Sequence, residues 1–299
     1  MIHFTLAFIG IFIWLFSLPL IMLFAFLCIP LGMLSFVLTV VISLCVQWHH
    51  KEDIIVHSRL RNFIKNINLQ KWFTSFKYTN NTKKADLLIC HPHGILCCGM
   101  IVHHFNSINT VFAVAPILFY VPIFGWVARS LGLIPASKRM IKKALRQNCT
   151  VILYVGGIQE LLAHNEKKIY LEKRWGFVKI ASELNKSLTP VWIQGEYDTF
   201  YNPSLPFLEC RQWLSKYLGF GIMFPWIYGY KNIWIPKPVP LHVHFGRAVT
   251  PQNLTLKALK DQYHFHLCQL IASVSGEKLQ AIASYHSLTL PTLSQDLHL

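Results

Sequence analysis

Two histidines, His91 and His93, stand in the run His91-Pro92-His93-Gly94, directly after the apolar segment 86–90. The segment predicts a short buried strand, and the proline and glycine predict a stiff turn at its end. Because imidazole titrates near neutral pH, histidines held on such a turn suit general acid–base chemistry. By itself the run fits a pair of surface histidines equally well, so its interpretation depends on the residues around it.

Glycines and carboxylates follow two further apolar segments, 151–155 and 189–194. Gly156-Gly157 and then Glu160 follow the first segment, and Gly195-Glu196 follows the second. In open α/β sheets, ligands bind outside the carboxyl ends of the strands. If these strands and the strand 86–90 run parallel, both histidines and both carboxylates meet at one edge of a sheet.

Helical segments alternate with the predicted strands. Helices are expected at 137–147, at 176–184 and in 256–283, with a further helix ending at 102–105 and a fourth strand at 241–245. This alternation predicts an α/β domain with a largely parallel sheet. Two segments remain: 51–84 is interpreted as an amphipathic linker, and 108–134 as a half-buried segment that faces a bilayer.

Residues 1–50 contain no Lys, Arg, Asp or Glu. A helix crosses the hydrocarbon core with about 20 residues, so this stretch is long enough to cross twice, with a turn at Pro30-Leu31-Gly32. We expect an N-terminal transmembrane helical hairpin over 1–50 and a second domain over 51–299. The alternative is a single tilted span followed by an interfacial helix. The basic residues that follow the hairpin predict that 51–299 faces the cytosol.

Composition and charge narrow the class of partner. Charged residues make up 14% of the chain and hydrophobic residues 53%, whereas soluble domains typically carry about 25% charged residues. The net charge of +15 falls entirely within residues 51–299. Such a charge suits anionic lipid or a phosphorylated substrate. A nucleic-acid partner is not expected, because no nucleic-acid-binding motif is present and a membrane anchor argues against one.

A metal site is the competing interpretation of the histidine run. Cys90, Cys97 and Cys98 lie close to both histidines in the sequence. Zinc prefers tetrahedra of Cys and His, but one pair of ligands is normally matched by a second pair. The later cysteines stand singly. We therefore expect no metal site and keep zinc as the alternative.

Several motifs occur together in the order of one known family. They are His91-Pro92-His93-Gly94, Val155-Gly156-Gly157-x-x-Glu160, Arg174-Trp175-Gly176-Phe177-Val178-Lys179 and Gly195-Glu196. With this set the chain resembles, over about residues 86–270, the diacylglycerol acyltransferase type 2 family, which includes monoacylglycerol and wax-alcohol acyltransferases. The resemblance implies a membrane-anchored acyltransferase domain at the endoplasmic reticulum membrane or the lipid droplet, with its active site facing the cytosol.

The resemblance also implies a reaction. A fatty acyl group would move from acyl-CoA, a co-substrate, to the hydroxyl of diacylglycerol or monoacylglycerol, with no cofactor. The alternatives are a wax-ester or fatty-alcohol acyltransferase and a catalytically silent membrane scaffold of the same fold. The implied partners are acyl-CoA, a neutral lipid alcohol and the membrane, and a homo-oligomer is left open.

No Gly-x-Ser-x-Gly motif is present, so we expect direct transfer without an acyl-enzyme. Direct transfer needs a base for the acceptor hydroxyl and hydrogen-bond donors for the developing oxyanion. We predict His93 as the base, His91 as shaping the turn or sharing the role, and Glu160 as orienting the histidine. The two histidines can exchange these roles equally well. The predicted oxyanion donors are backbone amides near Gly94 or Gly156-Gly157.

The predicted substrate-binding residues are Arg174, Lys179, Gly176, Phe177 and Glu196. Arg174 and Lys179 are the expected contacts of the CoA phosphates, followed by the basic residues of 138–146. A face against anionic lipid is the alternative for 138–146. For Gly176-Phe177, packing is favoured over ligand contact, since glycine allows a helix and a strand to approach closely. Glu196 fits equally well as the structural partner of a buried arginine.

Overall fold

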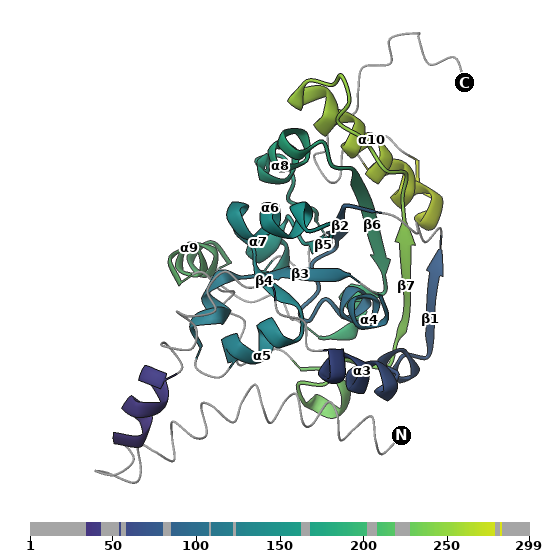
Figure 1. Ribbon diagram of the computed structural model, residues 1–299. Coiled ribbons are helices and arrows are strands. Elements are labelled where there is room, and N and C mark those ends of the chain that lie inside the picture. Colours follow the sequence, from purple (N-terminus) through teal and green to yellow (C-terminus); the bar gives the residue numbers. More distant parts are fainter. Residues whose placement is uncertain are drawn as a thin grey trace.

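A seven-stranded sheet with helices on both faces forms the centre of the computed structural model (Figure 1). The structure describes residues 34–42, 54, 58–79, 85–107, 109–121, 124–162, 168–201, 208–218, 228–278 and 282. The strand order is β1-β7-β6-β2-β5-β3-β4. Neighbouring strands are parallel, except that β6 and β7 are antiparallel. The expected α/β fold with a largely parallel sheet is confirmed.

The central strand of the sheet is β2, with β5 on one side and β6 on the other, both parallel to it. The strands are β1 (Ser75–Thr79), β2 (Leu87–His91), β3 (Thr110–Val114), β4 (Leu133–Pro135), β5 (Thr150–Leu153), β6 (Leu188–Gln194) and β7 (Pro240–Phe245). All residues of β2 are buried, because helices cover both faces of the sheet; a continuous apolar run is typical of such a strand. The strand is one residue longer than expected at its carboxyl end, so His91 belongs to it.

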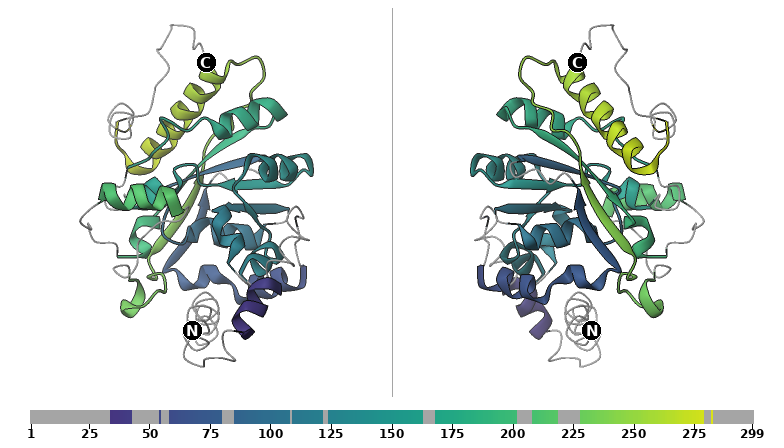
Figure 2. Two further views of the ribbon diagram at one scale, coloured as in Figure 1. Left: turned by 90° about the vertical axis from the view of Figure 1, so that its left-hand side faces the viewer. Right: turned by 90° about the vertical axis from the view of Figure 1, so that its right-hand side faces the viewer.

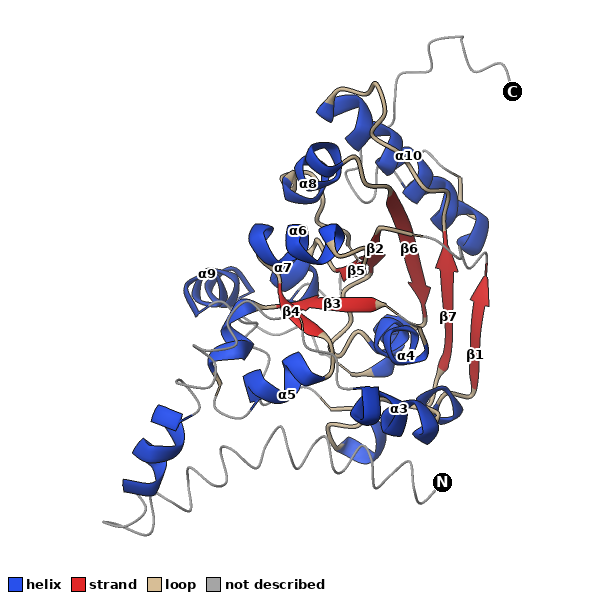
Figure 3. Cartoon of the chain, in the orientation of Figure 1, coloured by secondary structure: helices blue, strands red, loops and turns tan. Residues whose placement is uncertain are grey.

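Helices cover both faces of the sheet (Figures 2 and 3), and a hydrophobic core lies between the sheet and the helices on each face. The helices are α3 (Ser58–Ile67), α4 (Cys98–Asn106), α5 (Phe124–Ser130), α6 (Lys138–Arg146), α7 (Gly157–Leu162), α8 (Gly176–Leu184), α9 (Leu208–Leu218) and α10 (Leu256–Ser275). Because side chains alternate along a strand, Leu87 and Ile89 of β2 pack with α6, α8 and α10. Leu88 and Cys90 pack with α3 and α4 on the other face.

The helices expected at 137–147 and 176–184 are found as α6 and α8. Ser137 caps α6, since its hydroxyl accepts a hydrogen bond from the Met140 amide at 3.3 Å. Local sequence signals were sufficient here because a cap and an amphipathic pattern are both short-range features.

Part of segment 108–134 differs from the expected half-buried segment that faces a bilayer. It contains β3, the 3₁₀ helix η2 (Pro116–Tyr120), α5 and β4. β3 lies between β5 and β4, and nearly all of its residues are buried, so its apolar side chains fill a core. Segment 51–84 does contain an amphipathic helix, α3, but it is more than a linker, because β1 pairs with β7 at the edge of the sheet.

The expected transmembrane hairpin over 1–50 lies mostly outside the described residues. Within it, residues 34–42 form a helix, and Leu34, Leu38 and Ile42 are exposed. In the described part of the chain, no helix is both long enough and apolar enough to cross a membrane. The hairpin and the domain boundary at residue 50 therefore stay predictions.

Candidate active site

The histidine turn, residues 91–94, leaves the carboxyl end of β2, which lies between β5 and β6 in the sheet. His91 is the last residue of β2 and is fully buried, whereas His93 is half-buried. The imidazole of His93 lies beside Tyr154 and Cys97, which belong to the core that contains α3 and α4. The turn thus holds one buried histidine and one histidine with partial access to solvent.

Glu160, on α7, contacts both histidines. Its Oε1 accepts hydrogen bonds from His91 Nδ1 and from the Tyr170 amide, each at 3.1 Å. Its Oε2 accepts the backbone N–H of His93 at 3.0 Å. The sequence predicts His93 as the base and Glu160 as the carboxylate that orients its imidazole. The carboxylate instead contacts the imidazole of His91 and only the main chain of His93.

The environment of Glu160 favours the ionised carboxylate. Burial alone would raise its pKa, but the charge and hydrogen bond of His91, together with the Tyr170 amide, hold the pKa of Glu160 below its ordinary value. The carboxyl also needs a glycine beside it, because a Cβ at Gly156 would overlap the Glu160 side chain. The glycine at the end of β5 therefore makes room for the buried acid.

The imidazole of His93 has the geometry of a general base. Its Nδ1 lies 2.8 Å from the Gly94 carbonyl oxygen. Since a carbonyl only accepts, Nδ1 carries the proton and the lone pair is on Nε2. Burial lowers the pKa of His93 more than the Gly94 carbonyl and Glu160 raise it, so the pKa lies below its ordinary value. A neutral imidazole with its lone pair on Nε2 can accept a proton near neutral pH.

Glu196 lies under the opposite side of the histidine turn, at the start of α4. Its two oxygens accept the amides of Cys98 at 2.7 Å and Gly99 at 3.0 Å. A Cβ at Gly94 would overlap its carboxyl. Burial raises the pKa of Glu196 to about 7, although the two amides lower it. The sequence suggests Glu196 for substrate binding; its side chain is fully buried, and both oxygens contact the backbone of α4.

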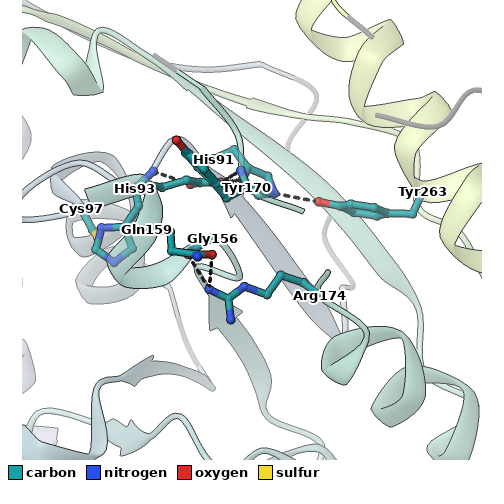
Figure 4. A network of polar contacts seen from close by, with 9 residues as sticks. His91, His93, Cys97, Gly156, Gln159, Tyr170, Arg174 and Tyr263 are labelled. Atoms are coloured by element: carbon teal, nitrogen blue, oxygen red, sulfur yellow. Dashed lines mark hydrogen bonds and ion pairs between the residues drawn. The ribbon is translucent and has the colours of Figure 1, made fainter. Parts of the chain in front are cut away.

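The other predicted binding residues lie at different distances from the turn. Arg174 is next to it, because its Nη2 donates to the Gly156 carbonyl at 3.3 Å and to Gln159 Oε1 at 2.9 Å (Figure 4). Lys179 is exposed on α8, and Phe177 is buried in the core. Gly176 has open space where a Cβ would stand, so close packing is not the reason for a glycine at this position.

Comparison with known proteins supports the resemblance. The model of the family described as diacylglycerol acyltransferase matches residues 26–280. The chain belongs to this family. The recognition made from its motifs is thereby confirmed.

Three relatives of the chain have nearly the same sequence identity to it. 2-acylglycerol O-acyltransferase 1 from Homo sapiens is 30% identical over 245 residues, 72% of this chain and 72% of that protein. 2-acylglycerol O-acyltransferase 3 from Homo sapiens is 30% identical over 62% of this chain and 61% of that protein. Diacylglycerol O-acyltransferase 2 from Danio rerio is 29% identical over 58% and 55%. The chain thus spans less than two thirds of the length of the last two.

A solved structure, the 1-acyl-sn-glycerophosphate (LPA) acyltransferase PlsC from Thermotoga maritima, aligns with 93% of this chain and 95% of its own. The TM-score is 0.48 and the sequence identity 13%. At this level the likeness supports no conclusion about the chain.

One contact at the site, between His91 and Tyr263, was not indicated by the sequence. The Tyr263 hydroxyl, on α10, lies 3.2 Å from His91 Nε2. Its ring packs edge-on against Phe177, with centroids 5.2 Å apart. Tyr263 is 172 positions from His91, in a segment that the sequence predicts only as a helix. No local sequence pattern indicates a contact over such a separation.

Other expected groups are already engaged in contacts. The Gly94 amide, one of the proposed oxyanion donors, donates to the Pro92 carbonyl at 3.1 Å. On α6, Lys138 pairs with Glu183 at 2.8 Å, and Lys142 pairs with the same carboxylate, which neutralises part of the basic face.

Among the described residues, no group of three or more His, Cys, Asp and Glu side chains is placed to hold a metal ion.

Proposed function

We propose that this protein is an acyl-CoA-dependent O-acyltransferase that esterifies the free hydroxyl of diacylglycerol or monoacylglycerol and so makes neutral lipid. Membership of the diacylglycerol acyltransferase family supports the reaction class. The names of its relatives, diacylglycerol and 2-acylglycerol O-acyltransferases, support an acylglycerol acceptor over a fatty alcohol.

In the proposed reaction, the acceptor oxygen attacks the thioester carbonyl of acyl-CoA while His93 Nε2 takes the hydroxyl proton. Negative charge develops on the former carbonyl oxygen, where the Gly156 and Gly157 amides are the donors we propose. Collapse breaks the carbon–sulfur bond, and His93 returns the proton to the leaving CoA thiolate. One thioester is exchanged for one oxygen ester, so the reaction calls for no cofactor.

The observation that carries this proposal is the state of His93. Its Nδ1–H donates to the Gly94 carbonyl at 2.8 Å, which leaves the Nε2 lone pair for the acceptor hydroxyl. His91 is less suited to be the base, because its two nitrogens contact Glu160 and Tyr263 and its side chain is fully buried. These contacts favour His93 over His91, a choice that the sequence alone left open.

We assign the CoA phosphates to Arg174 and Lys179. Arg174 borders the histidine turn through Gly156 and Gln159, and the remaining N–H groups of a guanidinium suit the oxygens of a phosphate. Lys179 is exposed on α8, a position that a long, flexible co-substrate can reach. Exposed basic residues of α6 are the next contacts in this assignment.

We also propose that the protein is bound to the endoplasmic reticulum membrane, with the lipid droplet as a second location and residues 51–299 in the cytosol. The uncharged stretch 1–50, the exposed apolar side chains at 34–42 and the net charge of +15 on the rest of the chain support membrane binding. A lipid acceptor would then reach the active site from the bilayer.

The test is a panel of acceptors. Isolated membranes that contain the protein are given labelled acyl-CoA with diacylglycerol, monoacylglycerol or fatty alcohol. We expect labelled acylglycerol product, and about 10²- to 10⁴-fold less from membranes that carry His93→Ala at equal abundance. Wax ester as the main product would change the acceptor but keep the reaction class. No product from any acceptor, with the protein folded, would overturn the proposed function in favour of a silent scaffold.

A further inference from the structure

A tyrosine of α10 closes the side of His91 that faces away from Glu160. The Tyr263 hydroxyl lies 3.2 Å from His91 Nε2 (Figure 4), and Glu160 Oε1 lies 3.1 Å from His91 Nδ1. The side chains of all three residues are fully buried. The imidazole of His91 is therefore held between a hydroxyl and a carboxylate, away from solvent.

The positions of the protons follow from the partners. A carboxylate only accepts hydrogen bonds, so His91 Nδ1 donates to Glu160 and carries a proton. Burial raises the pKa of Tyr263 well above its ordinary value, so its hydroxyl keeps the proton. This neutral hydroxyl lies within hydrogen-bond distance of His91 Nε2.

The same set of contacts reaches His93. Glu160 Oε2 accepts the His93 amide at 3.0 Å, while Oε1 contacts His91. An unbroken series of hydrogen bonds thus runs from the Tyr263 hydroxyl through the imidazole of His91 and the carboxylate of Glu160 to the main chain of His93. Displacement of the His91 ring would shift the carboxylate, and with it the turn that holds the His93 imidazole.

We propose that Tyr263 is a positioning residue for acyl transfer: its hydroxyl fixes the ring of His91 and, through Glu160, the place of His93 Nε2. The proposal rests on the proposed function, because it assigns Tyr263 a part in that reaction. The ring of Tyr263 has a separate role, since it packs edge-on against Phe177. Phenylalanine at this position therefore keeps the packing and removes only the hydroxyl.

The first test is a double-mutant cycle of Tyr263→Phe and His91→Gln, measured as acyl transfer in isolated membranes. Tyr263→Phe alone is expected to lower kcat about tenfold to a hundredfold, as for the loss of one buried hydrogen bond, with the KM values for both substrates unchanged. In the His91→Gln background the same change should have little further effect, because the hydroxyl acts through His91. An equal loss in both backgrounds would overturn the proposal.

The matched control is Tyr78→Phe. Tyr78 lies on β1, and its ring packs edge-on against His103 with centroids 5.5 Å apart, so the substitution is the same but the contact is different. Tyr78→Phe should leave kcat unchanged. A loss as large as that of Tyr263→Phe would mean that removal of a tyrosine hydroxyl acts generally, and the positioning role would be rejected.

Nitrogen-15 spectra of the purified protein separate this proposal from the proposed function, because they need no activity. The His91 signals are identified by their loss in His91→Gln. We expect a protonated Nδ1 that is hydrogen-bonded to Glu160, with Tyr263→Phe shifting the Nε2 signal and the His93 amide signal. If neither signal moves, the positioning role is overturned even in an active enzyme. If both move but the unaltered protein transfers no acyl group, the contact is real and the role in catalysis falls with the proposed function.

Discussion

Two buried glutamates flank the histidine turn, and their environments differ. Glu160 and Glu196 are both fully buried, and each lies against a glycine, Gly156 or Gly94, that has no room for a Cβ. Glu160 contacts an imidazole as well as two backbone amides, and its pKa lies below its ordinary value. Glu196 contacts two backbone amides only, and its pKa is raised to about 7.

The difference teaches what sets the charge of a buried acid. Burial raises the pKa of both carboxyls, and two amides are insufficient to reverse it for Glu196. The imidazole of His91 makes the difference for Glu160. One side of the turn is thus held by an ionised carboxylate, and the other by a carboxyl that changes its charge near neutral pH. Each prediction below tests one part of this comparison.

The largest effect is expected from His93→Ala, because both glutamates support the turn that carries this imidazole. Loss of the general base should lower acyl transfer about 10²- to 10⁴-fold while the protein stays folded. The measurement is product formation in membranes at equal protein abundance. The control is His242→Ala on β7, which removes a histidine that contacts Ser75 at the edge of the sheet. Full activity of His93→Ala would reject His93 as the base and leave the family assignment intact.

The next effect separates the two glutamates. Glu160→Gln removes the charge opposite His91 and should lower kcat about tenfold to a hundredfold. Glu196→Gln should lower it less, about threefold, because Glu196 contacts no imidazole and already binds a proton at about pH 7. Activity and thermal unfolding are measured for both variants. If Glu196→Gln is the more damaging change, the two sides of the turn have been assigned the wrong way round.

The third prediction concerns the two glycines. Gly156→Ala and Gly94→Ala each place a Cβ against a buried carboxyl, and each should reduce the free energy of unfolding by about 1–3 kcal/mol. Gly176→Ala is the control, since open space surrounds that position and alanine favours a helix. Urea unfolding of the three variants gives the comparison. Equal stability of all three would show that the carboxyls shift without cost.

The smallest effect is a difference in pH dependence. The pKa of Glu196, about 7 when folded, lies above its ordinary value of 4.5, so the folded protein keeps a proton that the unfolded chain loses. Stability should therefore fall by about 1–2 kcal/mol as the pH rises from 5 to 7. Glu160 acts in the opposite sense: its lowered pKa adds stability above about pH 4.5 that is lost as the pH falls below that value.

Urea midpoints at pH 5 and pH 7 test this slope. The decrease should be smaller in Glu196→Gln than in the unaltered protein, with the exposed Glu277→Gln as the control. An equal change in urea midpoint between pH 5 and pH 7 in all three proteins would contradict the raised pKa of Glu196.

Short-range patterns were sufficient for the elements that lead to the site. Mostly apolar runs followed by turns that contain glycine marked β2, β5 and β6, and the cap at Ser137 marked the start of α6. Because the three strands are parallel, their carboxyl ends had to meet at one edge. The site could therefore be located from the sequence before any side-chain contact was known.

Pairing with distant strands decided the elements that were missed. β1 lies in a segment interpreted as an amphipathic linker; its five residues alternate polar and aromatic, and pairing with β7 makes them a strand. β3 is apolar enough to suggest a bilayer-facing segment, but it lies between β5 and β4 in the sheet. The choice of partner strand is not encoded within either segment, because the partner is far away along the chain.

The sequence by itself determined the chemistry available to this protein: two histidines on a turn, two nearby carboxylates, the glycines beside them and the motifs of the family. Only the tertiary structure decided which carboxylate contacts which imidazole. β2 extends to His91, which therefore shares the side of the strand with Leu87 and Ile89 and faces α10. The direction of a side chain at a strand end depends on where the strand stops, and its partner depends on which helix covers that face.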